Sequence, residues 1–444
     1  MTQFKDVASR QESRICFIYG LTPRIPLAAT GKYIGEVYDF GRLQAHVESG
    51  RNLLPRVIVE NEFVSPNSDP TEGCGVSLLP SMRKLRAILT VTPRGDAVLV
   101  LDGELKESLS SSEVAELLAA TCFERESIQV SERPVTDWLI AELANTSIYV
   151  YALKFGNDVH QCVFLGRELR DMLRLQGKRD QVAPLVPEIV YRGTVPAGSG
   201  SPLGVSIPSG LNNPGSTFVA HGRGVSLFSG WAPYLENAFM LTAISTVSSL
   251  EALRLSRHEA FDALALAQNV NFTSVDEARS LVSQLSSRLN EMQLDLSFGV
   301  ETYVDSILMP EMVIESFQGS LSRAAGIRES LDNTSRMLER VGTVISARLA
   351  KIETVDRERI EHRDRLVAVL VALATLLALP PTLLLAFFGI NSPQIHPNDS
   401  IFDLHVYWGA YVLAWLPFII LVSVGSVMYS RIRRRSESKP VTHR

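Results

Sequence analysis

The chain has 444 residues, a formal net charge of −5 and 46% hydrophobic residues, which gives room for two or three domains. No basic bias indicates nucleic acid binding, and no motif indicates an enzyme. The four cysteines are far apart without a CxxC pair, so we expect reduced thiols in the cytosol rather than disulfides or a zinc site: Cys16, Cys74, Cys122 and Cys162. The N-terminus lacks the apolar run of a signal peptide, so we expect the front of the chain to stay cytosolic.

Residues 1–185 predict an α+β cytosolic domain, because β-rich runs alternate with segments of helical periodicity. We interpret Asp158 and His160 as parts of a solvated turn. The expected elements are a hairpin of 86–91 and 97–101, a second hairpin of 146–155 and 159–165 around Gly156-Asn157-Asp158, and helices over 111–123 and 167–175.

Residues 186–233 are rich in Gly, Pro and Ser, which indicates a linker or a long surface loop. Two glycine pairs lie here, Gly198-Ser199-Gly200 and Gly222-Arg223-Gly224. Neither has the spacing of a phosphate-binding loop, so we interpret both as loop residues.

Residues 234–309 predict a helical hairpin, and residues 310–365 predict one stalk helix without interruption. An apolar seven-residue repeat runs along the stalk and is typical of a coiled-coil seam: Phe317, Ala324, Leu331, Leu338, Ile345 and Ile352. Two kinds of partner fit this seam. They are identical helices of other copies, or the preceding helical hairpin of the same chain.

Two C-terminal stretches, 366–388 and 406–430, are each long and apolar enough to cross a bilayer as a helix. The only ionisable residues between Leu366 and Ser430 lie in the connecting segment: His396, Asp399, Asp403 and His405. Basic residues precede the first stretch and fill the tail, 431–444. The positive-inside rule therefore predicts a multi-pass protein of the cytoplasmic (inner) membrane with both termini in the cytosol.

The C-terminal part resembles the CorA family of divalent metal-ion transporters. The resemblance depends on Pro380-Pro381-Thr382 in the first span, Phe388-Gly389-Ile390-Asn391 at its outer end, Trp408-Gly409 opening the second span, and the basic tail. The family hallmark is an aromatic residue followed by Gly-Met-Asn. Isoleucine stands in place of methionine here, as in the ZntB-type zinc-transport branch.

This resemblance implies a CorA-like homopentameric funnel in which the first spans line one pore. The signature motif and the outer loop would together span 389–405. The motif residues would surround the outer mouth, with Asn391 contacting the hydration shell of the ion: Gly389, Ile390 and Asn391. Leu379, Thr382 and Ala386 are the further pore-lining candidates, and Asp399 and Asp403 would form an acidic collar that attracts cations. For Thr382 the alternative is a hydroxyl bonded to its own helix, and for His396 and His405 it is solvation in the loop.

We therefore expect a divalent-cation channel or transporter for Mg²⁺, Zn²⁺, Co²⁺ or Ni²⁺, with membrane lipid and identical subunits as partners, and no cofactor besides the ion. Neither span contains an ionisable group, which favours a channel over proton-coupled transport. The second hypothesis is a ligand-gated signalling or defence effector with a CorA-like pore. The sequence assigns no regulatory metal site in the front domain.

Overall fold

The computed structural model describes residues 11–437, except 26–30, 65–80, 107–108, 131, 177–182, 194–204, 214–215, 270–274, 306–307, 390–399 and 401–402. The chain divides into two compact units, Met1–Arg348 and Leu349–Arg444. The helix α11 (Ile327–Gly389) begins in the first unit and ends in the second. Each unit is described separately below.

Unit 1 is built on an eight-stranded sheet with the order β2-β3-β4-β5-β1-β8-β10-β9. Neighbouring strands are antiparallel, except that β10 pairs with β8 in parallel. The strands are β1 (Arg14–Thr22), β2 (Lys32–Tyr33), β3 (Arg56–Val64), β4 (Met82–Val91), β5 (Ala97–Leu105), β8 (Lys154–Leu165), β9 (Phe218–His221) and β10 (Val225–Ser229). β6 (Gln129–Val130) and β7 (Arg133–Pro134) form a separate pair.

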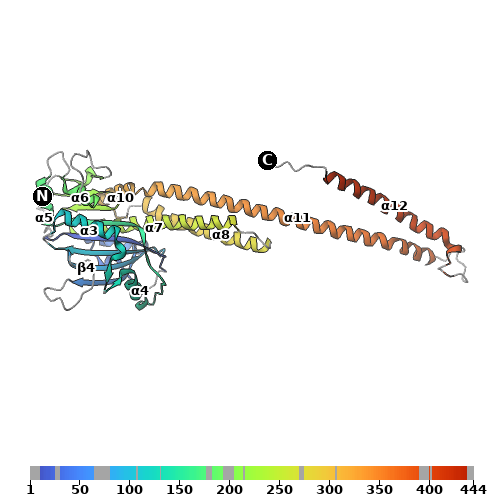
Figure 1. Cartoon of the computed structure of the whole chain (residues 1–444), viewed down its shortest axis with the longest axis horizontal. Helices are drawn as coiled ribbons and strands as arrows, with labels where there is room; N and C mark the ends of the chain where they lie inside the picture. Colours follow the sequence, from blue (N-terminus) through green and yellow to red (C-terminus); the bar gives the residue numbers. More distant parts are fainter. Residues whose placement is uncertain are drawn as a thin grey trace. The chain divides into compact units, whose positions relative to one another are not determined.

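Helices cover both faces of the sheet, which explains why the central strand β1 is buried along almost its whole length. One hydrophobic core joins the sheet to α3 (Ser111–Phe123), α4 (Val135–Asn145), α5 (Arg167–Gln176) and α6 (Leu185–Tyr191). The core on the other face joins it to α1 (Ile34–Val37), α2 (Gln44–Ser49), α7 (Pro233–Asn269) and α10 (Met312–Ala325). Figure 1 shows these layers at the N-terminal end of the chain.

The first predicted hairpin is confirmed: β4 and β5 pair around a turn closed by the Thr92 N–H donating to the Asp96 carbonyl at 2.9 Å. The helices predicted over 111–123 and 167–175 are confirmed as α3 and α5. Ser110 and Glu113 form a capping box at the start of α3, so that side chains satisfy N–H groups that have no partner inside the helix.

The second predicted hairpin is wrong, because residues 154–165 form the single strand β8. Gly156-Asn157-Asp158 is an irregularity inside that strand, where the register against β1 shifts between Tyr19 and Leu21. Glu251 of α7 presses against Gly156, where a Cβ atom would stand 2.4 Å from its carboxylate oxygen. The glycine therefore admits a buried side chain rather than a chain reversal, and His160 is buried instead of solvated.

The structure of residues 186–233 differs from the predicted linker, because most of α6 and the two strands β9 and β10 lie within this segment. The sheet therefore continues beyond the predicted domain boundary at residue 185. Gly222-Arg223-Gly224 forms the turn between β9 and β10, closed by the Gly222 N–H donating to the Val225 carbonyl at 2.8 Å.

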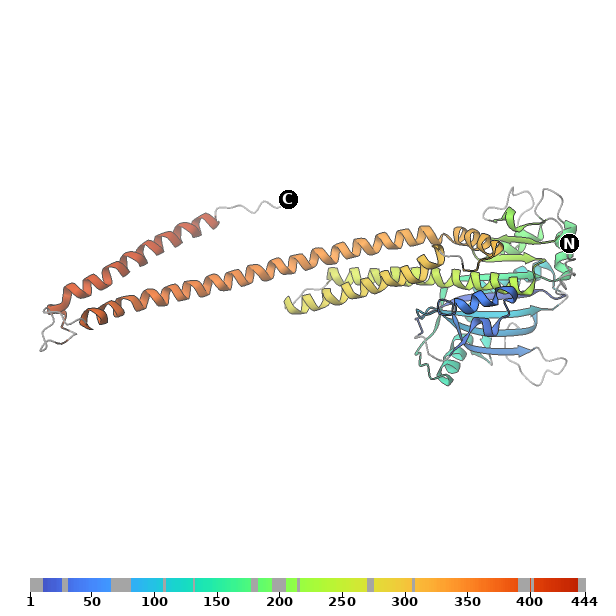
Figure 2. The same cartoon turned by 180° about the vertical axis from the view of Figure 1, so that it is seen from behind.

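The helical part of unit 1 begins with α7 and α8 (Val275–Asp295), in the range predicted for a helical hairpin. A π-helical segment (Leu296–Glu301) and α9 (Thr302–Asp305) follow. In both views α7 and α8 lie beside the N-terminal part of α11 (Figures 1 and 2). Unit 2 contains the rest of α11 and α12 (Leu404–Glu437).

The apolar seam of the stalk is filled within the same chain. Leu331, Leu338 and Ile345 are buried, and Arg257 of α7 donates to the Thr334 hydroxyl at 2.8 Å. Gly342 of α11 allows a close approach by Leu289 of α8. Of the two alternatives for this seam, the structure contains the bundle with the preceding helices of the same chain.

The predicted uninterrupted stalk helix is wrong at Gly326. This residue has φ +69°, ends α10, and is followed by a new helix that begins at Ile327. Glycine adopts this left-handed conformation without the steric cost that other residues incur, so an apolar repeat across the position is compatible with a break.

Replacing Gly326 by alanine should lower the free energy of unfolding by about 1 kcal/mol, because alanine disfavours positive φ. Gly319 lies inside α10 with open space around its Cα. Gly319→Ala is therefore the matched control and should leave stability unchanged or raise it by up to about 1 kcal/mol. Chemical denaturation of the full chain in detergent measures both variants, and equal effects would contradict the break at Gly326.

Stability should fall on acidification, because burial lowers the pKa of His160 to about 3. An unfolded histidine titrates near 6.5, so below that pH the unfolded chain binds a proton that the folded chain does not bind. From pH 7 to pH 5 this one residue should cost about 2 kcal/mol of unfolding free energy. His160→Gln should flatten that part of the pH profile, whereas the exposed His258→Gln should not.

Candidate pore-lining site

Two helical stretches among the described residues are long and apolar enough to cross a membrane, judged by length and composition alone. Pro233–Ala267 in α7 is 78% buried, so it is a core helix of unit 1. Ile327–Ala386 in α11 contains an 18-residue segment with a higher mean hydropathy of 2.3, and 6% of that segment is buried. A shorter apolar stretch, Leu404–Ile420, lies in α12.

One face of α11 in unit 2 carries mostly small and hydroxyl residues together with Leu379, with Val371 at its edge, whereas other large exposed apolar side chains such as Val369, Leu370 and Leu385 lie elsewhere on the helix. This face is called the stripe below, and its members follow one another in steps of four and three residues: Ala368, Ala372, Thr375, Leu379, Thr382, Ala386 and Gly389. At about 100° per residue they fall within an arc of about 100° around the helix. All seven are exposed in the single chain.

A different face of α11 is covered. Leu376 and Leu384 are half-buried and Pro380 is buried, in contrast to the exposed stripe. Among the α12 residues whose side chains the structure describes, Tyr407 and Ala414 are buried. We infer that α12 covers this part of α11, about 130° around the helix from the centre of the stripe, so that the stripe is left open.

Two threonine hydroxyls lie one heptad apart on the stripe. The Thr375 hydroxyl donates to the Val371 carbonyl at 2.8 Å. The Thr382 hydroxyl donates to the Ala378 carbonyl, with the Leu379 carbonyl oxygen 3.2 Å away. The alternative weighed for Thr382, a hydroxyl bonded to its own helix, is therefore present. The hydroxyl hydrogen is used within the helix, but the lone pairs of the hydroxyl oxygen can still accept hydrogen bonds from water.

Pro380 and Pro381 lie inside α11 and have no N–H group. The carbonyls of Leu376 and Leu377 therefore lack their usual helical donors. In hydrocarbon an unsatisfied carbonyl costs several kcal/mol, so this turn requires another helix or water as a partner. An isolated helix in lipid offers neither.

The structure places four of the predicted residues, Leu379, Thr382, Ala386 and Gly389, on one face of one helix. Ile390, Asn391, Asp399 and His396 lie outside the described residues. Asp403 directly precedes α12, and its carboxylate accepts a hydrogen bond from the His405 N–H at 3.2 Å, as expected of a helix N-cap. Asp403 and His405 are both exposed.

Sequence reasoning missed three members of the stripe, Ala368, Ala372 and Thr375. The heptad spacing from Thr382 and Leu379 would have identified them, because Thr375 precedes Thr382 by seven residues and Ala372 precedes Leu379 by seven.

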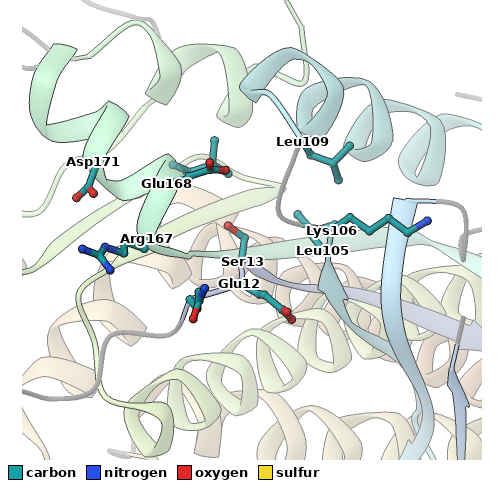
Figure 3. Close-up of a pocket in the computed structure, with 10 residues that line it drawn as sticks. Glu12, Ser13, Leu105, Lys106, Leu109, Arg167, Glu168 and Asp171 are labelled. Carbon is teal, nitrogen blue, oxygen red and sulfur yellow. The ribbon is translucent and has the colours of Figure 1, made fainter. Parts of the chain in front are cut away.

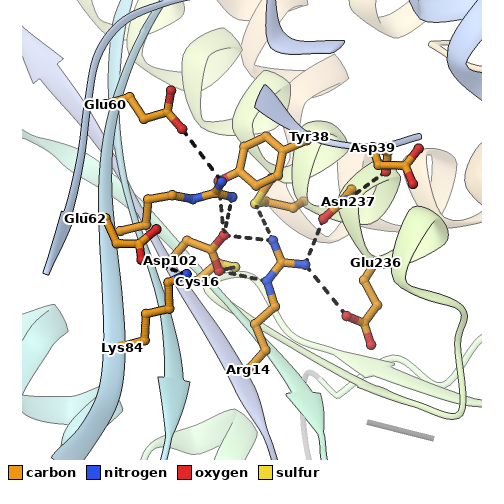
Figure 4. A network of polar contacts seen from close by, with 12 residues as sticks. Arg14, Cys16, Tyr38, Asp39, Glu60, Glu62, Lys84, Asp102, Glu236 and Asn237 are labelled. Atoms are coloured by element: carbon orange, nitrogen blue, oxygen red, sulfur yellow. Dashed lines mark hydrogen bonds and ion pairs between the residues drawn. The ribbon is translucent and has the colours of Figure 1, made fainter. Parts of the chain in front are cut away.

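Unit 1 contains a buried polar network around Asp102 (Figure 4). Arg14 donates to both Asp102 carboxylate oxygens, at 2.7 and 2.9 Å. Tyr38, Arg86 and Cys16 donate to the same carboxylate at 3.1, 3.2 and 3.3 Å. Burial by itself raises the pKa of the Asp102 carboxyl, but Arg14 outweighs burial and holds that pKa well below its usual range.

The same network joins the sheet to α7, because Arg14 also donates to the Asn237 side chain at 2.8 Å. Four side chains of the protein donate to the Asp102 carboxylate. We therefore interpret the network as a structural link between the sheet and α7.

A surface hollow of about 190 Å³ lies between the ends of β1 and β5 and the start of α5 (Figure 3). Lys106 and Arg167 lie at its rim together with Glu168 and Asp171, so both signs of charge are present. Among the described residues no group of three or more His, Cys, Asp or Glu side chains is arranged to hold a metal ion.

Comparisons with protein-family models, with curated proteins and with solved structures find no match to this chain. The resemblance to CorA-type transporters therefore depends on the sequence motifs of the C-terminal part.

Asp102→Asn should destabilise unit 1 by about 3–5 kcal/mol, because it removes the nearer of the two carboxylates that pair with the buried Arg14 and leaves only Glu236, 3.7 Å away. Lys84→Gln on the neighbouring strand β4 breaks the ion pair with Glu62, whose two side chains are 41% and 48% exposed. This variant should lower the free energy of unfolding by less than about 1 kcal/mol. Chemical denaturation of the full chain measures both. A small effect of Asp102→Asn would show that the network does not hold the sheet to α7.

Proposed function

We infer that this chain is a subunit of an oligomeric membrane pore that conducts hydrated divalent cations. The observation that carries this proposal is the stripe, an exposed face of α11 on which every residue except Leu379 is small or carries a hydroxyl group. Copies of the helix arranged around an axis with their stripes inward would surround a narrow path with two rings of hydroxyl groups, while most of the large apolar side chains would face lipid or neighbouring helices.

The chemistry of the stripe fits a hydrated ion. Mg²⁺ loses its water reluctantly, so a pore for it has to accept hydrogen bonds from the hydration shell. The Thr375 and Thr382 oxygens are such acceptors, and an Asn391 carboxamide at the outer end of the helix would add another. Neutral oxygens bind these waters less tightly than a ring of carboxylates, which allows the ion to leave.

The two prolines favour a helix that is packed against others over a single helix in lipid, because their turn leaves carbonyls that need donors from neighbours or water, and α12 is one such neighbour. The pentameric state, the inner-membrane location and the cytosolic position of both termini follow from the family resemblance and the positive-inside rule. They belong to the proposal. Asp399 and Asp403 would attract cations to the outer mouth in such an assembly.

A passive pore would suffice for uptake. A membrane potential that is negative inside drives each elementary charge inward with about 2.3 kcal/mol per 100 mV, and a divalent ion experiences twice this free-energy difference.

The purified full chain, reconstituted in vesicles, should carry Mg²⁺, Zn²⁺, Co²⁺ or Ni²⁺ inward at rates that dye-based flux assays measure ion by ion. Asn391→Ala should abolish the flux or its selectivity, because it removes the carboxamide from the outer mouth. Asn398→Ala in the same loop is the matched control and should behave as the native chain does.

Three outcomes would change the proposal. Selective flux through Asn391→Ala equal to that of the native chain would remove the role assigned to Asn391. No flux through native vesicles would reject transport. A non-selective current that begins only when a cytosolic ligand is added would favour the signalling or defence effector instead.

A further inference from the structure

The face of α11 that carries the stripe continues into charged residues on its N-terminal side. Three residues before Ala368 is Arg365, and four residues before Arg365 is Glu361, so the alternation of steps is unbroken. At about 100° per residue, Glu361 and Arg365 lie within about 40° of Leu379 around the helix axis. Asp364 lies on this face too, about 60° from Leu379 in the opposite direction, so the turn that precedes the stripe carries two carboxylates and one guanidinium group.

The two side chains form an ion pair in the single chain, with Arg365 Nη2 3.6 Å from Glu361 Oε2. Both are exposed, at 79% and 58%. An exposed i,i+4 pair in water contributes little and exchanges readily, so each charge is available to a competing partner. The pair precedes the apolar part of the helix, at the end opposite to Gly389.

We propose that Glu361 and Arg365, with Asp364 between them, form the cytosolic mouth of the pore and together determine how strongly that mouth attracts divalent cations. The inference rests on the proposed function, because only an assembly around the stripe brings copies of Glu361 near one another. In that assembly the Glu361 carboxylates form a ring about two helical turns before Ala368, the N-terminal residue of the stripe.

The opposing charges have different consequences for a permeating ion. A divalent cation carries twice the charge of a guanidinium group, so it competes with Arg365 for the carboxylates of Glu361. Arg365 reduces the net attraction and thereby speeds release of the ion. A conducting site needs both properties, since an ion has to enter and also to leave.

The test uses the full chain in vesicles and measures the initial rate of Mg²⁺ flux at low ionic strength and at Mg²⁺ concentrations below saturation. Glu361→Gln should lower that rate about threefold or more, and Arg365→Gln should raise it by a similar factor, because each changes the charge at a narrow mouth. The charge-conserving variants Glu361→Asp and Arg365→Lys should stay close to the native rate.

Two control variants each remove one charge, one negative and one positive, from another side of the helix. Asp356→Asn and Arg363→Gln change residues about 140° and 160° from Leu379, and both should conduct at the native rate. At about 1 M monovalent salt the Debye length is about 3 Å, so the differences between variants should shrink. Equal elution of all variants in detergent confirms that the assembly is intact.

The outcomes separate this inference from the proposed function. If Glu361→Gln and Arg365→Gln both conduct at the native rate while Asn391→Ala does not, the charged mouth is rejected and the pore stands. If Asp356→Asn lowers the rate as much as Glu361→Gln does, the effect belongs to general surface charge, and the inference is also rejected. Native vesicles without flux would overturn both.

Discussion

In its apolar part α11 has large hydrophobic side chains around most of its circumference and small or hydroxyl side chains along the stripe. Small residues allow another helix to approach closely, and lipid cannot supply donors to the carbonyls released by Pro380 and Pro381. This asymmetry constrains every other part of the proposal. In the proposed assembly the stripe would face inward, and the opposite side would face lipid and α12.

The N-terminal part of α11 meets a different requirement. Its apolar seam is already buried against α7 and α8, so this seam is not available to other copies of the chain. Contacts between subunits in unit 1 would have to use other faces. Gly326 separates this helix from α10, which packs on the sheet through Phe317 and Leu321. The break lets one apolar repeat serve two elements with different partners.

The sheet of unit 1 provides a base whose stability depends on buried polar groups as well as on apolar packing. The Asp102 carboxylate accepts hydrogen bonds from side chains of β1, β4 and the segment around Tyr38. Arg14 also donates to Asn237 and so extends the network to α7. Charges buried in this way are costly unless every partner is present. The network therefore fixes one arrangement of α7 on the sheet, and α7 is the helix against which the N-terminal part of α11 packs.

The sequence by itself determined the elements whose signals are local: the hairpin of β4 and β5, the capped helix α3, and the apolar stretch that ends at Gly389. It failed where a residue's role depends on distant neighbours. Gly156 resembles a turn residue in the sequence, but in the fold it makes room for Glu251. The Gly/Pro-rich segment resembles a linker, yet two of its short runs complete the sheet, because β10 pairs with the edge of β8 and β9 then pairs with β10. The seam predicted a partner but not which one, since periodicity describes one surface, and only tertiary packing decides what covers it.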